Sequence, residues 1–225
     1  SIQVFQISRS LGIQRFVFAS TCSNYGRMSD PNGYVSEESE LMPISLYAET
    51  KVEIEKFLLN ASYSAGVTPT LLRFATLFGI SPRMRFDLTV NHFSMELYTT
   101  GQIEVHGSQF WRPYVHVRDA ARAITLVLST PLEIVGGQVF NVGDTDQNYR
   151  KGQIATVAQQ QVGDRAKIRY VAKEEDPRDY RVAFDKVQDT LGFQITRTVE
   201  DGVREIINAL EGGLITDVDN AKYRN

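Results

Sequence analysis

The sequence predicts an α/β fold built on a mainly parallel sheet. Short apolar runs typical of buried strands alternate with longer segments that have helical periodicity. Glycines stand where several of these segments stop, as at Gly12 and Gly66. With 225 residues, 42% hydrophobic and 23% charged, the chain is long enough for one large domain or two small ones.

The expected elements follow in chain order. Ile2, Phe5 and Leu11 lie near helical spacing before Gly12, which predicts a helix at the start. We then expect a buried strand at 15–20, a long loop at 22–45, a helix from Ser45 to about 65 and a strand at 68–74. Further helices are expected at 88–98, 118–128, 151–162, 184–191 and 199–210, and strands or extended pieces at 103–106, 114–117, 139–142 and 168–171.

Charge and cysteine content narrow the class of protein. The formal net charge is −3 and no long run of one sign occurs, so the sequence does not predict nucleic-acid binding. We find no apolar run of membrane-spanning length and no signal peptide, and expect no membrane partner. The single cysteine, Cys22, cannot form an internal disulfide, and the simplest interpretation is a reducing, cytoplasmic location.

Tyr47 and Lys51 are the first candidates for chemistry. They stand four residues apart in the second expected helix, so both side chains leave the same helical face. A nearby ammonium favours the phenolate form of a tyrosine, and a phenolate can act as a general base. The spacing alone is common on exposed helices. The strand at 15–20 adds context, because it leads into Ser20 and Thr21, and ligands of open α/β sheets bind outside the carboxyl ends of strands.

Five motifs occur in a fixed order. They are Ala19-Ser20-Thr21-Cys-Ser-Asn-Tyr-Gly26, Tyr47-Ala-Glu-Thr-Lys51, Leu72-Arg-Phe74-Ala75-Thr76-Leu-Phe-Gly79, Arg112-Pro-Tyr-Val-His116-Val-Arg-Asp119 and Phe140-Asn-Val-Gly143. In this order they resemble the extended short-chain dehydrogenase/reductases, especially NAD-dependent sugar-nucleotide epimerases and dehydratases of the UDP-glucose 4-epimerase kind. The resemblance covers about residues 15–210.

The family resemblance implies a Rossmann-like parallel sheet with a smaller C-terminal substrate-binding lobe. Residues 1–80, with 114–142 returning to them, would form the remaining C-terminal part of the NAD-binding domain and carry the catalytic residues. Residues 81–113 and 143–225 would mainly form the substrate-binding lobe. The resemblance also implies a homodimer that packs the helices at 1–11 and about 46–65, where apolar residues spread around the second helix: Val52, Phe57, Leu58, Leu59 and Tyr63.

The resemblance further implies roles for individual residues. Tyr47 would be the base, Lys51 its partner and Thr21 a hydroxyl that binds the reacting oxygen. The residues expected to contact NAD are Ala19, Ser20, Tyr47, Lys51, Phe74 and Ala75. The residues expected to contact a nucleotide-diphosphate sugar are Thr76, Asn91, Val105, Arg112 and Arg178. An arginine can hold phosphate oxygens through two parallel hydrogen bonds, although Arg178 fits a solvated surface position almost as well.

The implied reaction oxidises a sugar, usually at C4, to a keto sugar and reduces it again on the other face, with NAD as cofactor. His116 matches an interior histidine of the family, and no metal site is expected, because His92 and His106 lack ligand spacing. The alternatives left open are another sugar-nucleotide oxidoreductase, such as a reductase or decarboxylase, and a non-catalytic nucleotide-binding relative.

Two departures from the family pattern matter. The Gly-x-x-Gly-x-x-Gly turn that cradles the pyrophosphate does not occur, nor does the acidic residue that holds the adenosine ribose. We therefore expect the N-terminal part of the domain to be missing, and the fragment to bind NAD poorly and be inactive. Cys22 and Ser23 stand where 4,6-dehydratases carry an Asp-Glu pair, which argues against dehydration.

Overall fold

Three parallel strands form the central sheet of the computed structural model, which describes residues 1–28, 30, 33–61, 66–174 and 178–223. The strands lie in the order β1 (Arg15–Thr21), β2 (Thr68–Phe74) and β6 (Val139–Val142). Thr21 pairs with Phe74, and Phe74 pairs with Val142. The register therefore brings the carboxyl ends of all three strands to one edge of the sheet.

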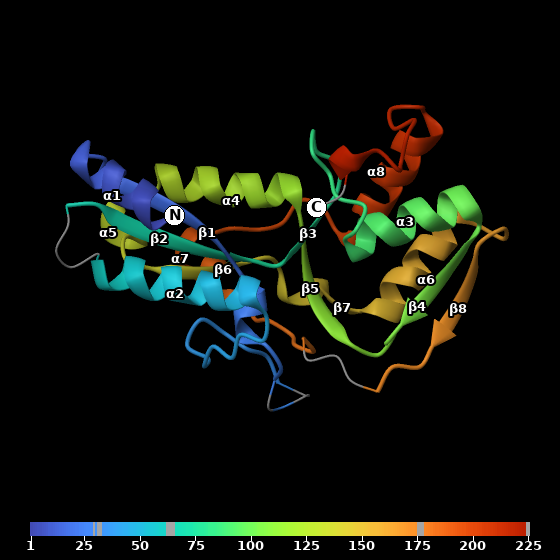
Figure 1. The fold of residues 1–225 in the computed structure, drawn as a ribbon, viewed down its shortest axis with the longest axis horizontal. Coiled ribbons are helices and arrows are strands. Elements are labelled where there is room, and N and C mark those ends of the chain that lie inside the picture. The colour runs from blue at the N-terminus through green and yellow to red at the C-terminus, as the bar shows by residue number, and fades with distance from the viewer. Residues whose placement is uncertain (29, 31–32, 62–65, 175–177, 224–225) are drawn as a thin grey trace.

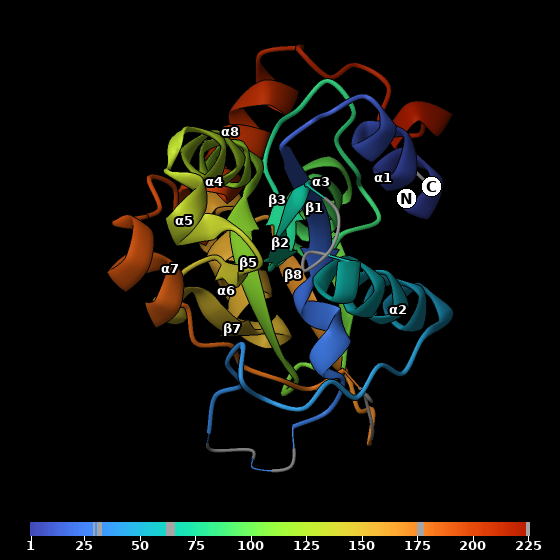
Figure 2. The ribbon, with the colours of Figure 1, turned by 90° about the vertical axis from the view of Figure 1, so that its left-hand side faces the viewer.

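Helices cover both faces of this sheet, as Figures 1 and 2 show. On one face, α1 (Ile2–Ser10) and α2 (Leu46–Ala61) pack on the strands through Phe5, Phe18 and Leu58. The other face is covered by α4 (Val117–Ser129), α5 (Leu132–Val135) and α7 (Asp185–Leu191). Two helical layers around a parallel sheet form the Rossmann-like arrangement that the sequence predicts.

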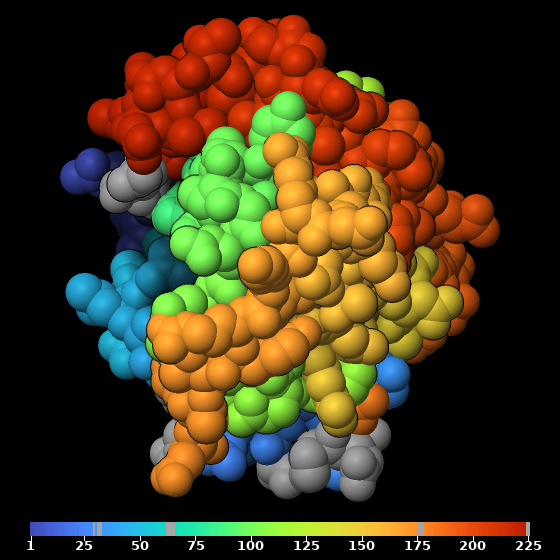
Figure 3. All heavy atoms as spheres, turned by 90° about the vertical axis from the view of Figure 1, so that its right-hand side faces the viewer, coloured from blue at the N-terminus to red at the C-terminus, as the bar shows by residue number. Residues whose placement is uncertain are grey.

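A second lobe follows the sheet. Its two parallel strands, β4 (Gln102–His106) and β8 (Lys167–Val171), pack with α3 (Thr89–Thr100), α6 (Lys151–Val162) and α8 (Val199–Glu211) around a core of their own. Figure 3 looks onto the outer surface of this lobe, where the orange segment that contains β8 and the red C-terminal segments lie.

A small three-stranded sheet joins the two parts. Its middle strand, β5 (Trp111–His116), pairs in parallel with β3 (Thr76–Phe78), which follows β2 after one residue, and antiparallel with β7 (Asn148–Arg150). Residues from both sides thus reach the carboxyl edge of the central sheet. Short 3-10 turns lie at Cys22–Tyr25, Thr145–Gln147 and Ala221–Tyr223.

The predicted elements are all present within the described residues. The strands at 68–74 and 139–142 and the helix at 151–162 have the expected bounds, and the other ends shift by up to three residues. The short elements β3, β7 and α5 and the 3-10 turns were not predicted, because they are too short for a helical period and are not marked by an apolar run between turn residues. The last residues of the second predicted helix, including Tyr63, fall outside the described residues.

The C-terminal segment contributes to both parts of the molecule. Phe184, Val187 and Phe193 belong to the same core cluster as Phe140 and Val142 of β6. The segment from about 180 to 193 therefore packs on the central sheet, whereas α6 and α8 belong to the second lobe. Among the residues that the structure describes, every helix is too short or too polar to span a bilayer.

Candidate active site

A cavity of about 710 Å³ opens at the carboxyl ends of β1 and β2. It brings together the residues that the sequence singles out, except Asn91 and Val105. The strand ends contribute Ala19, Ser20, Thr21, Phe74, Ala75 and Thr76, α2 contributes Tyr47 and Lys51, and the opposite side contributes Arg112 and Arg178. The position agrees with the rule that ligands of open α/β sheets bind at this edge.

Tyr47 and Lys51 face the cavity from the first turns of α2. The Tyr47 side chain is 57% exposed, so its hydroxyl is accessible to a ligand. Lys51 is half-buried, and its Nζ donates a hydrogen bond of 2.6 Å to the carbonyl oxygen of Ala19. The Lys51 ammonium also lies 4.6 Å from the Phe18 ring centre and 5.7 Å from the Tyr47 ring centre. Burial lowers the pKa of Lys51, while the Glu55 carboxylate opposes this shift.

Thr21 is the last residue of β1 and keeps extended backbone angles. Its Oγ1 accepts a hydrogen bond of 3.1 Å from the backbone N–H of Ser23 and so caps the turn Cys22–Tyr25. This contact uses a lone pair and leaves the hydroxyl proton available to a ligand in the cavity. Ser20, one residue earlier, donates its hydroxyl proton to Glu55 in the protein interior.

Arg112 enters the cavity from β5 and is almost fully buried. Its Nη1 donates 2.6 Å to the carbonyl oxygen of Trp111, and its guanidinium carbon lies 5.6 Å from the centre of the Tyr180 ring. Burial raises the pKa of Tyr180 to about 12, so this ring stays neutral. Arg178, two residues before Tyr180, is exposed and borders the same cavity.

Sequence reasoning missed two further cations of the lining. Arg85 precedes α3 and pairs with Asp87, its Nε donating 2.9 Å to Oδ1, while Lys151 is the first residue of α6. Among the described residues, the side chains that line the cavity thus include Lys51, Arg85, Arg112, Lys151 and Arg178 and a single carboxylate, Asp87. No local spacing connects Arg85 with Lys151, so only the fold reveals this cationic wall. Such a wall suits an anionic ligand.

Asn91 and Val105 are not among the residues that line the cavity. Asn91 is buried in α3, where its Oδ1 accepts 3.0 Å from the N–H of Gly79 and its Nδ2 donates 3.0 Å to the carbonyl of Arg85. It therefore holds the segment that carries Arg85. Val105 lies fully buried in β4, within the core of the second lobe.

His116 is an interior structural residue, as expected. It is fully buried, its Nδ1 accepts from the N–H of Arg118 at the start of α4, and its Nε2 lies 2.8 Å from Glu205 Oε2. Because Nδ1 is the acceptor, Nε2 carries the ring proton and donates a hydrogen bond to Glu205. Among the described residues, no group of three His, Cys, Asp or Glu side chains is arranged to hold a metal ion.

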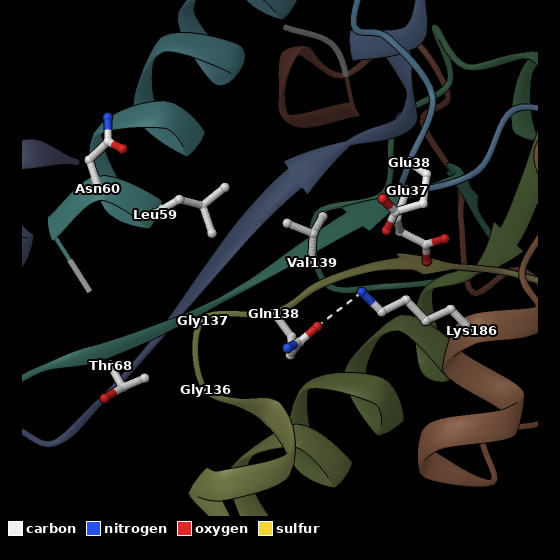
Figure 4. A pocket seen from close by; sticks show the side chains of 10 residues that line it. All are labelled: Glu37, Glu38, Leu59, Asn60, Thr68, Gly136, Gly137, Gln138, Val139 and Lys186. Carbon is white, nitrogen blue, oxygen red and sulfur yellow. Dashed lines mark hydrogen bonds between the residues drawn. The ribbon is translucent and has the colours of Figure 1, made fainter. Parts of the chain in front are cut away.

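A second cavity, of about 600 Å³, lies near the amino ends of β2 and β6. Figure 4 shows Thr68 and Val139, which begin these strands, and the hydrogen bond of 3.0 Å from Lys186 to Gln138. None of the expected catalytic or ligand-binding residues lines this cavity. Its place at the opposite ends of the strands makes the first cavity the candidate active site.

Two curated relatives have sequences similar to this chain. The "Uncharacterized UDP-glucose epimerase YtcB" of Bacillus subtilis is 33% identical over 146 residues, which cover 64% of this chain and 44% of that protein. The UDP-glucuronate 4-epimerase of Thermodesulfobacterium geofontis is 23% identical over 210 residues, which cover 92% of this chain and 62% of that protein. The chain therefore spans less than two thirds of the length of either relative.

Solved structures share the fold. MoeE5 in complex with UDP-glucuronic acid and NAD superposes with a TM-score of 0.80 at 25% identity, over 92% of this chain and 68% of that one. The Thermus thermophilus UDP-glucose 4-epimerase complex with NAD gives 0.80 at 20% identity, over 94% and 68%.

A family model assigns the chain directly. The model of the NAD dependent epimerase/dehydratase family matches residues 1–143. This range includes the central sheet, the candidate catalytic residues Tyr47 and Lys51 of α2, and Arg112. By this match the chain belongs to the NAD-dependent epimerase/dehydratase family, whose cofactor is NAD.

Proposed function

We propose that these residues form the catalytic and substrate-binding region of an NAD-dependent nucleotide-sugar 4-epimerase. One observation carries the proposal: Thr21, Tyr47 and Lys51 line the same cavity as the cationic wall that includes Arg112 and Arg178. A base and a hydroxyl beside a cluster of cations suit a sugar that carries a diphosphate. The printed names of similar proteins, such as the T. geofontis UDP-glucuronate 4-epimerase, support the same substrate class.

The residues present fit the nicotinamide-ribose end of NAD. Small side chains, Ala19 and Ala75, border the strand-end side of the cavity, and the Lys51 ammonium can donate to ribose oxygens there. The glycine-rich turn for the pyrophosphate does not occur in this sequence, so the fit concerns this end alone. When bound, NAD would accept a hydride from the sugar carbon and return it.

The chain's own groups would manage the proton and the substrate. Tyr47, as a phenolate beside the Lys51 ammonium, would take the proton of the sugar 4-hydroxyl and later give it back. Thr21 would donate its hydroxyl proton to the reacting oxygen, because the bond from the Ser23 N–H engages one lone pair of Oγ1 and not this proton. Arg112 and Arg178 would hold the diphosphate and leave the sugar free to turn over beside Tyr47.

We further propose a homodimer in a cytoplasmic setting. α1 exposes the apolar side chains of Ile2, Val4 and Ile7, and Leu11, which directly follows the helix, is exposed as well. The outer stripe of α2 is instead polar, with exposed Glu49, Thr50, Glu53, Lys56 and Asn60. An interface between copies would therefore draw its apolar area from α1 more than from α2. Light scattering at micromolar concentration tests this, and a monomer mass would contradict it.

The proposed cytoplasmic location rests on Cys22, a buried free thiol.

The test of the reaction uses the chain within a polypeptide that supplies the glycine-rich turn. UDP-glucose and UDP-glucuronate are incubated with this protein and NAD, and the configuration at C4 is followed by NMR. Formation of the C4 epimer supports the proposal. A net keto, reduced or decarboxylated product would favour the other oxidoreductases of the family, and binding of UDP without turnover would favour a non-catalytic relative.

A further inference from the structure

A buried carboxylate joins the elements that meet at the cavity. Glu55 lies about one helical turn beyond Lys51 in α2 and is 1% exposed. Its oxygens accept hydrogen bonds from Ser20 Oγ, from Asn24 Nδ2 at 3.0 Å and from Arg73 Nη2 at 2.7 Å. Ser20 belongs to the end of β1, Asn24 to the following turn and Arg73 to β2. One side chain of α2 therefore fixes the helix to the ends of two strands.

The contacts continue from Arg73 to the third strand. Arg73 Nη1 donates 3.0 Å to the Tyr25 hydroxyl, which donates 2.7 Å to Asn141 Oδ1 in β6. Burial raises the pKa of Tyr25, so its proton stays in place. Burial by itself lowers the pKa of Arg73, but the hydrogen bonds that Arg73 donates to Glu55 hold that pKa above its ordinary value. The buried pair is thus a guanidinium and a carboxylate.

Fold stability is a poor explanation for this pair. Removing two charges from water is costly, and apolar residues of similar volume often replace a buried ion pair without loss of stability. An ion pair with several directional hydrogen bonds does, however, define the relative position of its elements. Ser20, which this network positions, is the neighbour of Thr21 in β1, and Glu55 lies about one helical turn from Lys51 in α2. A misplacement of about 1 Å can reduce a catalytic rate by about 100-fold.

Glu55 also acts on the charge of Lys51. The ammonium of Lys51 faces the Ala19 carbonyl and the rings of Phe18 and Tyr47. Glu55 opposes the fall in the Lys51 pKa that burial causes. Among the described residues, Glu55 also interacts with Arg73 of β2 and with Cys22 of the turn after β1. Tyr25 in turn acts on Arg73, and Glu37 of the following loop acts on Cys22.

We propose that Glu55 is a positioning residue for the reaction, which holds the ends of β1 and β2 against the half of α2 that carries Tyr47 and Lys51. This inference rests on the proposed function. Glu55 itself does not line the cavity and acts through Ser20, Arg73 and the Lys51 ammonium.

The test compares Glu55→Gln with Glu53→Gln. Glu53 lies on the exposed side of the same helix, where it pairs only with Lys56 among the described residues, so its change removes the same charge without touching the network. We expect Glu55→Gln to lower kcat by about 100-fold at an unchanged KM. We also expect a lower pKa of Lys51, followed by NMR titration of ¹³C-labelled lysine, and unchanged affinity for UDP. Glu53→Gln should behave as the wild type.

A second variant separates position from folding. Glu55→Gln leaves the Arg73 charge without its carboxylate, whereas the double variant Glu55→Met, Arg73→Met removes both charges at similar volume. We expect the double variant to fold and to bind UDP, with the same loss of kcat and the same fall in the Lys51 pKa. A folded double variant with wild-type kcat and wild-type Lys51 titration would overturn the inference.

The outcome remains distinct from the proposed function. If the wild type converts no nucleotide sugar, the proposed function fails. The Lys51 titration still tests Glu55 in that case: a lower pKa in both Glu55 variants supports its role at Lys51, and an unchanged pKa overturns it.

Discussion

The Lys51 ammonium donates a hydrogen bond of 2.6 Å to the carbonyl oxygen of Ala19, two residues before the end of β1. This contact ties the helix that carries Tyr47 to the strand that carries Thr21. It also leaves two further ammonium protons of Lys51 for a ligand in the cavity, because a lysine has three donors. The predictions below follow from this arrangement.

Replacing Tyr47 with Phe should remove most turnover. The phenol would move a proton during the reaction, and such groups contribute about 10²–10⁴-fold in rate. UDP affinity should stay unchanged, because the phosphate contacts are expected from arginines. Turnover of nucleotide sugars and calorimetry with UDP measure the two effects. Tyr170→Phe, an exposed tyrosine outside the cavity, is the matched control. Wild-type turnover in Tyr47→Phe would refute the assigned base.

Replacing Arg112 with Ala should weaken UDP binding by roughly 1.5–3 kcal/mol, the range for a hydrogen bond to a charged group. Calorimetry gives the affinity, and circular dichroism checks that the fold is retained. Arg169→Ala, which removes an exposed arginine of β8, serves as the control for lost charge. Equal affinity of wild type and Arg112→Ala would mean that the diphosphate lies elsewhere.

The rate should decline at high pH through Lys51. Burial lowers the pKa of Lys51 below its ordinary value of 10.5, so the ammonium is lost at a lower pH than in an exposed lysine. The proposed reaction would need the charged form, and kcat should therefore fall as pH rises through this lowered pKa. Arginine stays charged over the whole range, so any activity retained in Lys51→Arg should lack this alkaline decline. An identical alkaline limb in both proteins would assign the decline to another group.

The Asp119 carboxylate should stabilise the fold at neutral pH, and this stabilisation should be lost when the carboxylate is protonated in acid. Its buried carboxylate accepts hydrogen bonds from the backbone N–H groups of Thr196 and Arg197 and from the Arg122 side chain. Burial alone raises the pKa of Asp119, but these bonds, led by those from Thr196, hold it below the ordinary 3.8. The stabilisation is thus complete above 3.8 and disappears as pH falls through the lower folded-state pKa.

Asp119→Asn should lower the free energy of unfolding at pH 7 by about 1.5–3 kcal/mol. The reason is that the side chain at this position, which accepts the hydrogen bonds, loses its negative charge. Urea unfolding at pH 7 and at pH 3 measures the difference between variant and wild type. The difference should shrink at the acidic pH. Asp217→Asn, near the exposed end of the chain, is a control that should change little.

The sequence by itself determined the fold class, most of the elements and the candidate reacting groups. Apolar runs and glycine stops are local signals, so the bounds of β2, β6 and α6 could be predicted from them. Tyr47 and Lys51 share a helical face because four residues make about one helical turn. Thr21 could be placed with them because the carboxyl ends of parallel strands meet at one edge.

Only the tertiary structure decided which distant residues share the cavity. Arg85 and Lys151 join Arg112 there because β5 and the second lobe fold back over the strand ends, a contact that no local spacing encodes. Asn91 and Val105 fit the family pattern by position. The Asn91 side chain is nevertheless buried and hydrogen-bonded to Gly79, and the Val105 side chain lies in the apolar core of the second lobe. Glu55 resembled any acidic residue of an amphipathic helix. Its role became visible only when Ser20 and Arg73 met it in the interior, because side-chain partners depend on how elements pack rather than on their order in the chain.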